Sequence, residues 1–393
     1  MDFQKLDIEI DKLFENSGIP ALSVIITDKD QNIYEKYLGF QNIENKTSFS
    51  KSSIVRIASM TKPITSLCVF QLIEKNLLSL ETNLEEIDDR FKNVKIIKKD
   101  EYDNIHYIKS QNKIKIKHLL NHTSGYGYQF LNPEIKYLVD NNLLQDLMND
   151  GDKFLDAPIL FEPGTKWNYG IGLDILGHLI EKITNQKLEN YMRENIFNLL
   201  NMNNTSFNLN NNDFENLAYV YTIKKKKEIQ IDNFFEELQN KRIKREFHAG
   251  GGGLFSTTQD YTKFMRVFLN NGFVNNHQII SKESIDKMTS NQIGDLLVKR
   301  TPSVDETLAS TIKTNEEIEK KFGYGFMINN ETTNEGRPKG SISWSGIFNT
   351  TFWIDFKNQI GCAVFMQNLP NVNELTYEAF CKIENNIYQV IND

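Results

Sequence analysis

Cysteine is scarce in this chain of 393 residues, which contains only three: Cys68, Cys362 and Cys381. No two of them have the spacing of a metal-binding motif, and Cys68 and Cys362 lie in apolar runs. Cysteines of this kind are usually small members of a hydrophobic core in a reducing compartment. The sequence therefore predicts no metal site, and it implies no metal or organic cofactor.

Long apolar runs are also absent. The longest, residues 21–26 and 360–366, are far shorter than the roughly 20 residues that span a bilayer. Residues 1–7 are acidic and lack the apolar segment of a secretion signal. We expect a cytoplasmic protein that is not bound to a membrane and does not meet cell-wall substrates.

The chain has no excess of positive charge. Its formal net charge is −7 and its isoelectric point is near 5.6, so nucleic acid is not expected as a partner. The one basic run, residues 224–227, lies between alternating segments at 219–223 and 228–231. This pattern predicts a solvated hairpin with a charged tip.

Several well-known catalytic motifs are missing. The sequence contains no Gly-x-Ser-x-Gly elbow, His-Glu-x-x-His pair, Cys-x-x-Cys pair, Walker loop or Gly-x-Gly-x-x-Gly fingerprint. His118 and His122 are four residues apart, but the segment Thr123-Ser124-Gly125 breaks the helix directly after His122. We therefore interpret these two histidines as structural residues that bracket a turn.

What the sequence does contain is the pattern Ser-x-x-Lys. It occurs five times, beginning at Ser48, Ser59, Ser110, Ser284 and Ser310. On a helix this spacing places hydroxyl and amine on one face, and a lysine in a dry cleft can be neutral and accept the proton of the serine. Four of the matches lie in polar stretches or, at residues 281–288, in a short surface-like helix. We interpret those four as solvated pairs.

Ser59 differs from the other four in its surroundings. It follows a strand-like apolar stretch, residues 54–58, and precedes residues 63–73, which are too apolar for a surface helix. Pro63 is tolerated only in the first helical turn, so the helix must begin close to Ser59. The serine then lies at the positive end of the helix dipole, where a developing oxyanion is stabilised.

Three further segments carry candidate chemistry. Residues 162–170 form a turn that ends in Tyr169, although a lone tyrosine is more typical of a packed aromatic residue than of a catalyst. Residues 248–254 contain four successive glycines, which indicates close backbone packing. Residues 343–347, Ser-Trp-Ser-Gly-Ile, precede a strand, and their glycine would let a substrate approach the strand edge.

The predicted elements indicate an α/β (α+β) fold that both chain ends complete. A helix is expected at residues 3–14, strands at 21–27 and 32–38, and mainly helices from Ser59 to about 205. Beyond 245, a capping box at 256–259 begins a helix, strands follow at 350–355 and 361–367, and a helix closes the chain at 374–391. We predict a discontinuous sheet domain of residues 1–75 and 245–393, and a mostly helical domain of residues 76–244. The active site is expected in the cleft between them.

The order of these motifs resembles that of the serine β-lactamase/penicillin-binding superfamily. The motifs are Ser-x-x-Lys, His-Thr-Ser-Gly, Pro-Gly-Thr-x-Trp-x-Tyr, Gly-Gly-Gly-Leu-x-Ser-Thr and Trp-Ser-Gly, spread over roughly residues 10–370. The sequence is most similar to the class C-like branch, which includes the family VIII esterases. This resemblance implies an antiparallel sheet flanked by helices, with a mostly helical insertion, as in the β-lactamase/transpeptidase fold.

The resemblance also implies roles for individual residues. Ser59 would be the acylated nucleophile and Lys62 its amine partner. Tyr169, as a phenolate or through Lys62, would pass the proton to the leaving group. The backbone N–H groups of Ser59 and Ile347 would form the oxyanion hole. The substrate would contact the segment Trp344-Ser345-Gly346.

Two departures from the family pattern bear on the substrate. Trp344-Ser345-Gly346 replaces Lys-Thr-Gly, which removes an ammonium that would bind a substrate carboxylate. Ile171 occupies the asparagine position of the Tyr-x-Asn motif. Both changes favour small neutral esters, so we predict a carboxylesterase. An amidase or weak β-lactamase/DD-peptidase-like enzyme is the first alternative, and a non-catalytic scaffold or binding protein is the second. Trp344 is interpreted either as a wall of the substrate pocket or as a packed strand residue.

Overall fold

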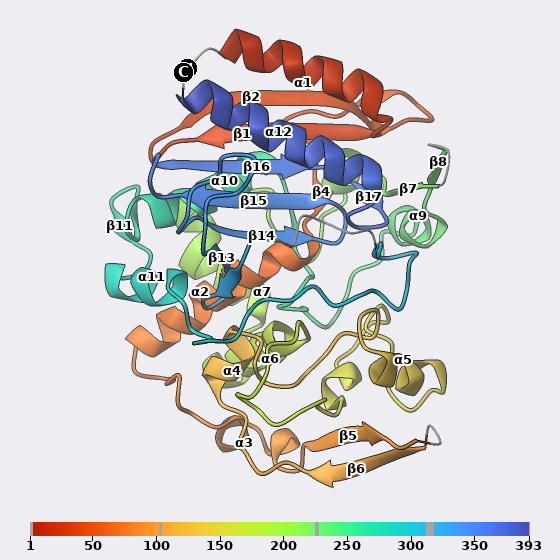
Figure 1. The fold of residues 1–393 in the computed structure, drawn as a ribbon, viewed down its shortest axis with the longest axis vertical. Helices are drawn as coiled ribbons and strands as arrows, with labels where there is room; N and C mark the ends of the chain where they lie inside the picture. Colours follow the sequence, from red (N-terminus) through yellow and green to blue (C-terminus); the bar gives the residue numbers. More distant parts are fainter. Residues whose placement is uncertain (1–2, 102–103, 225–227, 312–317, 393) are drawn as a thin grey trace.

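The computed structural model describes residues 3–101, 104–224, 228–311 and 318–392 (Figure 1). Its central feature is an antiparallel sheet whose described strands follow the order β12-β13-β14-β15-β16-β1-β2-β3. These strands are β12 (Lys320–Phe322), β13 (Met327–Asn329), β14 (Ile342–Gly346), β15 (Thr350–Asp355), β16 (Ile360–Phe365), β1 (Ala21–Thr27), β2 (Asn32–Asn42) and β3 (Thr47–Ser48). The two ends of the chain meet where β1 pairs with β16, with Val24 opposite Val364. This arrangement confirms the predicted fold class.

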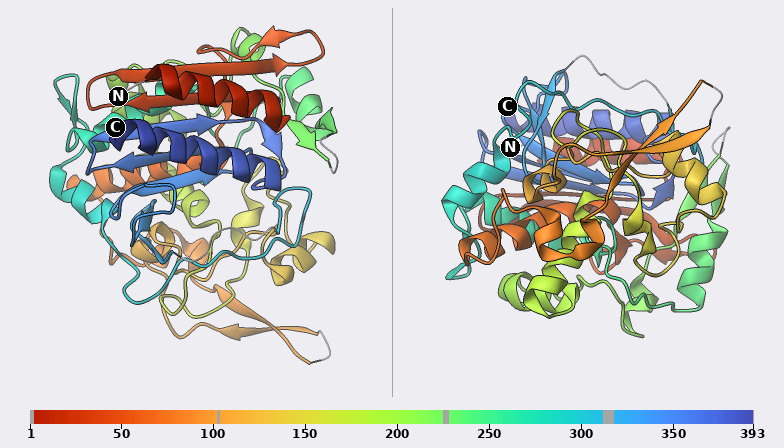
Figure 2. Two further views of the ribbon diagram at one scale, coloured as in Figure 1. Left: turned by 45° about the horizontal axis from the view of Figure 1, so that its top comes forward. Right: turned by 90° about the horizontal axis from the view of Figure 1, so that it is seen from below.

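Helices from both ends of the chain cover one face of the sheet. α1 (Phe3–Ser17) and α12 (Glu374–Asn392) lie side by side across it (Figure 2). Both helices carry apolar side chains at helical spacing. Among these, Ile10 of α1 and Ile387 of α12 are fully buried. Every residue of β1 is buried, because the opposite face of this strand is covered as well.

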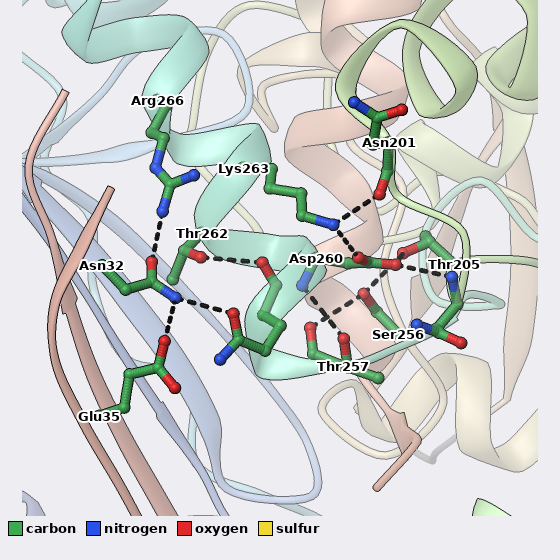
Figure 3. Close-up of polar contacts among 12 residues, drawn as sticks. Asn32, Glu35, Asn201, Thr205, Ser256, Thr257, Asp260, Thr262, Lys263 and Arg266 are labelled. Atoms are coloured by element: carbon green, nitrogen blue, oxygen red, sulfur yellow. Dashed lines mark hydrogen bonds and ion pairs between the residues drawn. The ribbon is translucent and has the colours of Figure 1, made fainter. Parts of the chain in front are cut away.

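Two further helices cover the other face. α2 (Thr61–Glu74) is apolar around its circumference and is buried from Thr61 to Leu72, as expected of a helix inside a core. α10 (Thr258–Leu269) packs on β1 and β16. Polar contacts hold α10 against neighbouring segments, because Arg266 donates to Asn32 at 2.5 Å and Lys263 donates to the Asn201 carbonyl at 2.5 Å (Figure 3).

The middle of the chain is mostly helical, and its helices α3 to α6 lie beyond the part of the sheet that β13 and β14 form (Figure 1). Its helices are α3 (Leu84–Ile87), α4 (Ile116–Leu120), α5 (Pro133–Asp140), α6 (Gly172–Thr184), α7 (Leu188–Met192), α8 (Asn198–Leu200) and α9 (Asn233–Asn240). The sequence predicts a helix over residues 133–149 in this region, but α5 ends at Asp140. A hairpin, β5 (Lys95–Lys99) with β6 (Ile105–Lys109), stands where the sequence indicated only helices and connections.

Short elements complete the chain. The two segments beside the predicted basic run pair with each other as β7 (Tyr221–Ile223) and β8 (Ile229–Ile231). Residues 225–227 of that run lie outside the described residues. The remaining elements are β4 (Val55–Arg56), β7 (Tyr221–Ile223), β8 (Ile229–Ile231), β9 (Phe255–Ser256), β10 (Phe273–Val274), β11 (His277–Gln278), α11 (Lys282–Thr289) and β17 (Asn368–Leu369). β4 pairs with β9, which brings the segment after the four glycines next to the residues before Ser59.

Candidate active site

Ser59 lies in a 3-10 turn, Ala58–Met60, that leads directly into α2. The turn is fixed from two sides, because the Thr61 hydroxyl donates to the Ala58 carbonyl at 2.7 Å and the Tyr261 hydroxyl donates to the Met60 carbonyl at 2.9 Å. Ser59 itself is partly exposed, whereas both of its neighbours are buried. The sequence prediction that a helix begins close to this serine is therefore confirmed.

The residue before the serine has an unusual backbone conformation. Ala58 has a φ of 43°, in the left-handed region that favours glycine. Such a conformation costs about 1–3 kcal/mol and persists only where the surrounding structure enforces it. Outliers of this kind cluster at active sites, so the backbone independently draws attention to Ser59.

The amine of Lys62 is buried beside the Ser59 hydroxyl. Its Nζ lies 3.0 Å from Ser59 Oγ and donates to the carbonyl oxygen of Gly251 at 2.5 Å. Only 1% of the lysine is exposed, and burial lowers the pKa of the amine to about 7, although the nearby Asp174 acts in the opposite direction. A substantial fraction of Lys62 is therefore neutral near pH 7 and can accept the proton of the serine.

Tyr169 also lies next to this amine. Its ring centroid is 4.7 Å from Lys62 Nζ, and its hydroxyl is buried without a hydrogen-bond partner among the described residues. Burial raises the pKa of this hydroxyl, while Ser59 and Trp344 act to lower it. The phenol is thus protonated near neutral pH, which suits a proton donor better than a base.

The end of β14 lies against the serine turn. A side chain on Gly346 would place its Cβ 2.3 Å from the Ile57 carbonyl oxygen, so only glycine permits this approach. The Asn371 side-chain amide donates to the Gly346 carbonyl at 3.1 Å and fixes the end of the strand. Ile347 follows directly and is partly buried, and Ser345 is exposed. The place of Ile347 in the oxyanion hole stays a prediction.

Trp344 belongs to an aromatic cluster around the site. Its ring centroid is 5.1 Å from that of Tyr169, 5.2 Å from that of Phe322 and 6.3 Å from that of His122. Trp344 is half-buried, and its indole nitrogen has no hydrogen-bond partner in the described part of the chain. Trp344 thus packs on its neighbours, and its role as a wall of the substrate pocket stays a prediction.

Three residues at the site were not predicted to act there: His122, Tyr128 and Asp174. His122, interpreted from the sequence as a residue of a turn, has its ring 4.9 Å from that of Tyr169, and burial together with the Lys62 charge lowers its pKa. The ring of Tyr128 lies 5.0 Å from Lys62 Nζ, and Tyr128 also donates to Asp174 at 3.0 Å. One signal was available for His122 and Tyr128, because both belong to or closely follow the His-Thr-Ser-Gly motif.

Comparison with known proteins decides the family. The sequence profile named Beta-lactamase matches residues 6–379, almost the whole chain. The protein belongs to the β-lactamase family. This membership confirms the resemblance seen in the motifs, and it makes the protein a serine hydrolase related to the β-lactamases.

Other members of the β-lactamase family that resemble this protein include esterases and acyltransferases. It is 25% identical to lovastatin esterase of Penicillium rubens over 98% of each chain. It is also 25% identical to monacolin J acid methylbutanoyltransferase of Aspergillus terreus, over 91% of this chain and 89% of that one.

Solved structures agree on the fold of this β-lactamase-family protein. Simvastatin synthase of Aspergillus terreus superimposes with a TM-score of 0.83 at 22% identity, covering 98% of this chain and 97% of the other. EstCE1, described as a hydrolase with promiscuous acyltransferase activity, gives a TM-score of 0.78 at 18% identity, covering 98% and 99%.

Two features of the described residues concern membranes and metal ions. In the described part of the chain, every helix is too short or too polar to cross a bilayer. The same residues contain no group of three or more His, Cys, Asp or Glu side chains that could hold a metal ion.

Proposed function

We propose that the protein is a carboxylesterase that hydrolyses small neutral esters through an acyl-enzyme on Ser59. The observation that carries the proposal is the contact of 3.0 Å between Lys62 Nζ and Ser59 Oγ, made by an amine whose pKa burial lowers to about 7. A serine activated in this way needs neither histidine nor metal. The same residues would also serve amide hydrolysis or a weak β-lactamase activity.

The reaction follows from the positions of the proton carriers. Neutral Lys62 accepts the Ser59 proton as Oγ attacks the ester carbonyl, and the N–H groups of Ser59 and Ile347 stabilise the oxyanion. Tyr169 gives its proton to the departing alkoxide and regains one from the Lys62 ammonium. Water then attacks the acyl group by the reverse route and releases the acid. No cofactor is required.

The substrate class is proposed from the surroundings of Ser59. Trp344, which packs on Tyr169 and on the fully buried Phe322, stands where the related Lys-Thr-Gly motif would present a cation. A neutral ester suits this position better than a substrate with a fixed carboxylate. The relative named lovastatin esterase takes a small-molecule ester, which supports the same choice.

Acyl transfer to an alcohol is a second candidate function. The observation that favours it is that relatives similar over most of the chain are named acyltransferases. The chemistry requires no additional residue, because the Lys62–Tyr169 pair that protonates a leaving alkoxide can also deprotonate an incoming alcohol. Whether water or alcohol prevails would depend on which one reaches the acyl-enzyme.

We also propose the division into a discontinuous sheet domain, residues 1–75 and 245–393, and a helical domain, residues 76–244. In Figure 1 the sheet drawn from both chain ends lies in the upper part of the molecule, and helices α3 to α6 of the middle segment lie in the lower part. Ser59 and Trp344 come from the first part and Tyr169 from the second. The active site would therefore lie in the cleft between them.

A comparison of substrates tests the proposed function. Wild-type protein should hydrolyse p-nitrophenyl acetate and butyrate with a kcat/KM at least tenfold above that for nitrocefin, about 1.4 kcal/mol in barrier, because Trp344 replaces the motif lysine that would bind the β-lactam carboxylate. Release of nitrophenol and opening of the lactam are both followed by absorbance. A preference for nitrocefin would replace the esterase assignment by a β-lactamase.

The pH dependence of the same reaction tests the role of Lys62. Since the neutral amine is the base, kcat/KM should rise about tenfold per pH unit below the pKa of about 7 and then level off. Initial rates with p-nitrophenyl butyrate between pH 5 and 9 would show this limb. A profile that is flat across this range would remove Lys62 from the role of base.

A further inference from the structure

One buried carboxylate at the site has no place in the mechanism above. Asp174 lies in the first turn of α6, only 4% exposed, and belongs to none of the motifs recognised in the sequence. Its Oδ1 accepts the backbone N–H of Gly251 at 2.9 Å, and its Oδ2 accepts the Tyr128 hydroxyl at 3.0 Å. A carboxylate is costly to bury, so a residue that is held by two donors in this way calls for a functional explanation.

The partner of Asp174 is the residue that holds the catalytic amine. Gly251 donates its N–H to Asp174 and accepts Lys62 Nζ at its carbonyl oxygen, so one residue connects the two charged groups. Next to it, the Gly250 carbonyl accepts the Thr65 hydroxyl at 2.7 Å, one turn along α2 from Lys62. The segment of four glycines is therefore fixed between α6 and α2.

The same contact explains why position 251 is glycine. A Cβ on Gly251 would lie 2.2 Å from Asp174 Oδ2 and 2.6 Å from its Cγ. The carboxylate therefore occupies the space that any side chain at this position would need. By contrast, a Cβ on Gly252 would meet no atom closer than 3.8 Å.

We propose that Asp174 is a positioning residue of the active site: it fixes the Gly251 backbone, and through the Gly251 carbonyl it orients the Lys62 amine toward Ser59. The inference rests on the proposed function, since it assigns Asp174 a role in the activation of Ser59. Asp174 itself contacts neither the serine nor, by this proposal, the substrate.

Asp174 also acts on Lys62 through its charge. The carboxylate raises the pKa of Lys62 against the effect of burial. Burial raises the pKa of Asp174, and Lys62 and the Gly251 N–H act against that rise. The other titratable groups facing this pair are the phenols of Tyr128 and Tyr169 and the imidazole of His122, and burial disfavours the charged form of each. Asp174 is thus the nearby anion that sets the protonation of the amine.

Two substitutions of Asp174 distinguish its effect on the position of Gly251 from the effect of its negative charge. Asp174→Ala removes the acceptor of the Gly251 N–H, so the plateau of kcat/KM for p-nitrophenyl butyrate should fall by about 100-fold, the usual effect of a small misplacement of a catalytic group. Asp174→Asn keeps an acceptor of the same size but loses the charge. It should recover most of the plateau, while its acidic limb moves to lower pH than in the wild type.

A second pair of variants guards against a failure of Asp174→Ala to fold. Gly251→Ala forces the carboxylate away from the glycine segment and should slow fluorophosphonate labelling of Ser59, whereas Gly252→Ala should label at the wild-type rate. A wild-type plateau and an unshifted acidic limb in the Asp174 variants, with full labelling of Gly251→Ala, would overturn the proposal.

Ser59→Ala, assayed alongside, keeps the two hypotheses apart. If Ser59→Ala retains the wild-type esterase activity, the proposed function has failed, and the role of Asp174 fails with it. If Ser59→Ala is inactive while the Asp174 and Gly251 variants behave like the wild type, the proposed function stands and only the role of Asp174 is wrong.

Discussion

Ser59→Ala is expected to abolish both ester hydrolysis and fluorophosphonate labelling. Removal of Oγ leaves no atom to form the acyl-enzyme, so kcat should fall by roughly 10⁴-fold or more, as for nucleophiles in other serine hydrolases. The fold should be unaffected, since the hydroxyl faces Lys62 from a partly exposed position. Burst and steady-state release of nitrophenol, together with intact-protein mass after labelling, would measure the loss.

Ser48→Ala is the matched control for this experiment. Ser48 begins another Ser-x-x-Lys match, but it is exposed on β3 rather than placed at the start of a buried helix. This variant should hydrolyse esters and take up the label at the wild-type rate. Labelling of a residue other than Ser59, or equal activity of Ser59→Ala and the wild type, would contradict the assignment of the nucleophile.

Lys62→Met should leave a folded protein whose Ser59 is acylated about 10³-fold more slowly, because positioned general bases typically contribute 10²–10⁴-fold. Methionine has nearly the length of lysine and is apolar, so it fills the buried space without requiring a charge to be desolvated. We therefore expect a Tm at least as high as that of the wild type. Labelling rates and thermal unfolding measure the two effects separately.

Lys75→Met provides the control, because Lys75 directly follows the same helix, α2, and its side chain is exposed. It should retain wild-type rates. If Ser59 were labelled as fast in Lys62→Met as in Lys75→Met, a group other than Lys62 would have to accept the proton of the serine. A Tm that fell together with the labelling rate would instead indicate that Lys62 supports the fold.

The parts of the fold and site that the sequence predicted are those that local spacing determines. Ser59 and Lys62 are one helical turn apart, and Pro63 limits where that helix can begin, so their proximity follows from the local sequence. The strands at the chain ends carry the longest apolar runs of the sequence, residues 21–26 and 360–366, and β15 was predicted with its observed bounds, residues 350–355. Local patterns of this kind need no knowledge of the tertiary structure.

The parts that were missed depend on distant partners. The β5–β6 hairpin has a lysine-rich first strand and a largely exposed second strand, so no apolar alternation marked it. Asp174 lies on an amphipathic helix where one acidic residue is unremarkable. Its partner Gly251 is 77 residues further along the chain. Only the fold brings the two together, so the sequence pattern alone offered no signal.

The pairing of β1 with β16 has a consequence for how the enzyme is made. Ser59, Lys62 and Tyr169 all leave the ribosome before the first residue of β14, yet β14 supplies the backbone that lies against the serine turn. β1, which precedes the turn, can pair with β2 early, but it gains its second neighbour in the sheet only once β16 has been synthesised. From the synthesis of Tyr169 to that of β14, the nascent chain thus carries all three reactive side chains without the strand that lies against the serine turn. Catalytic competence is acquired late, as one of the last events of synthesis.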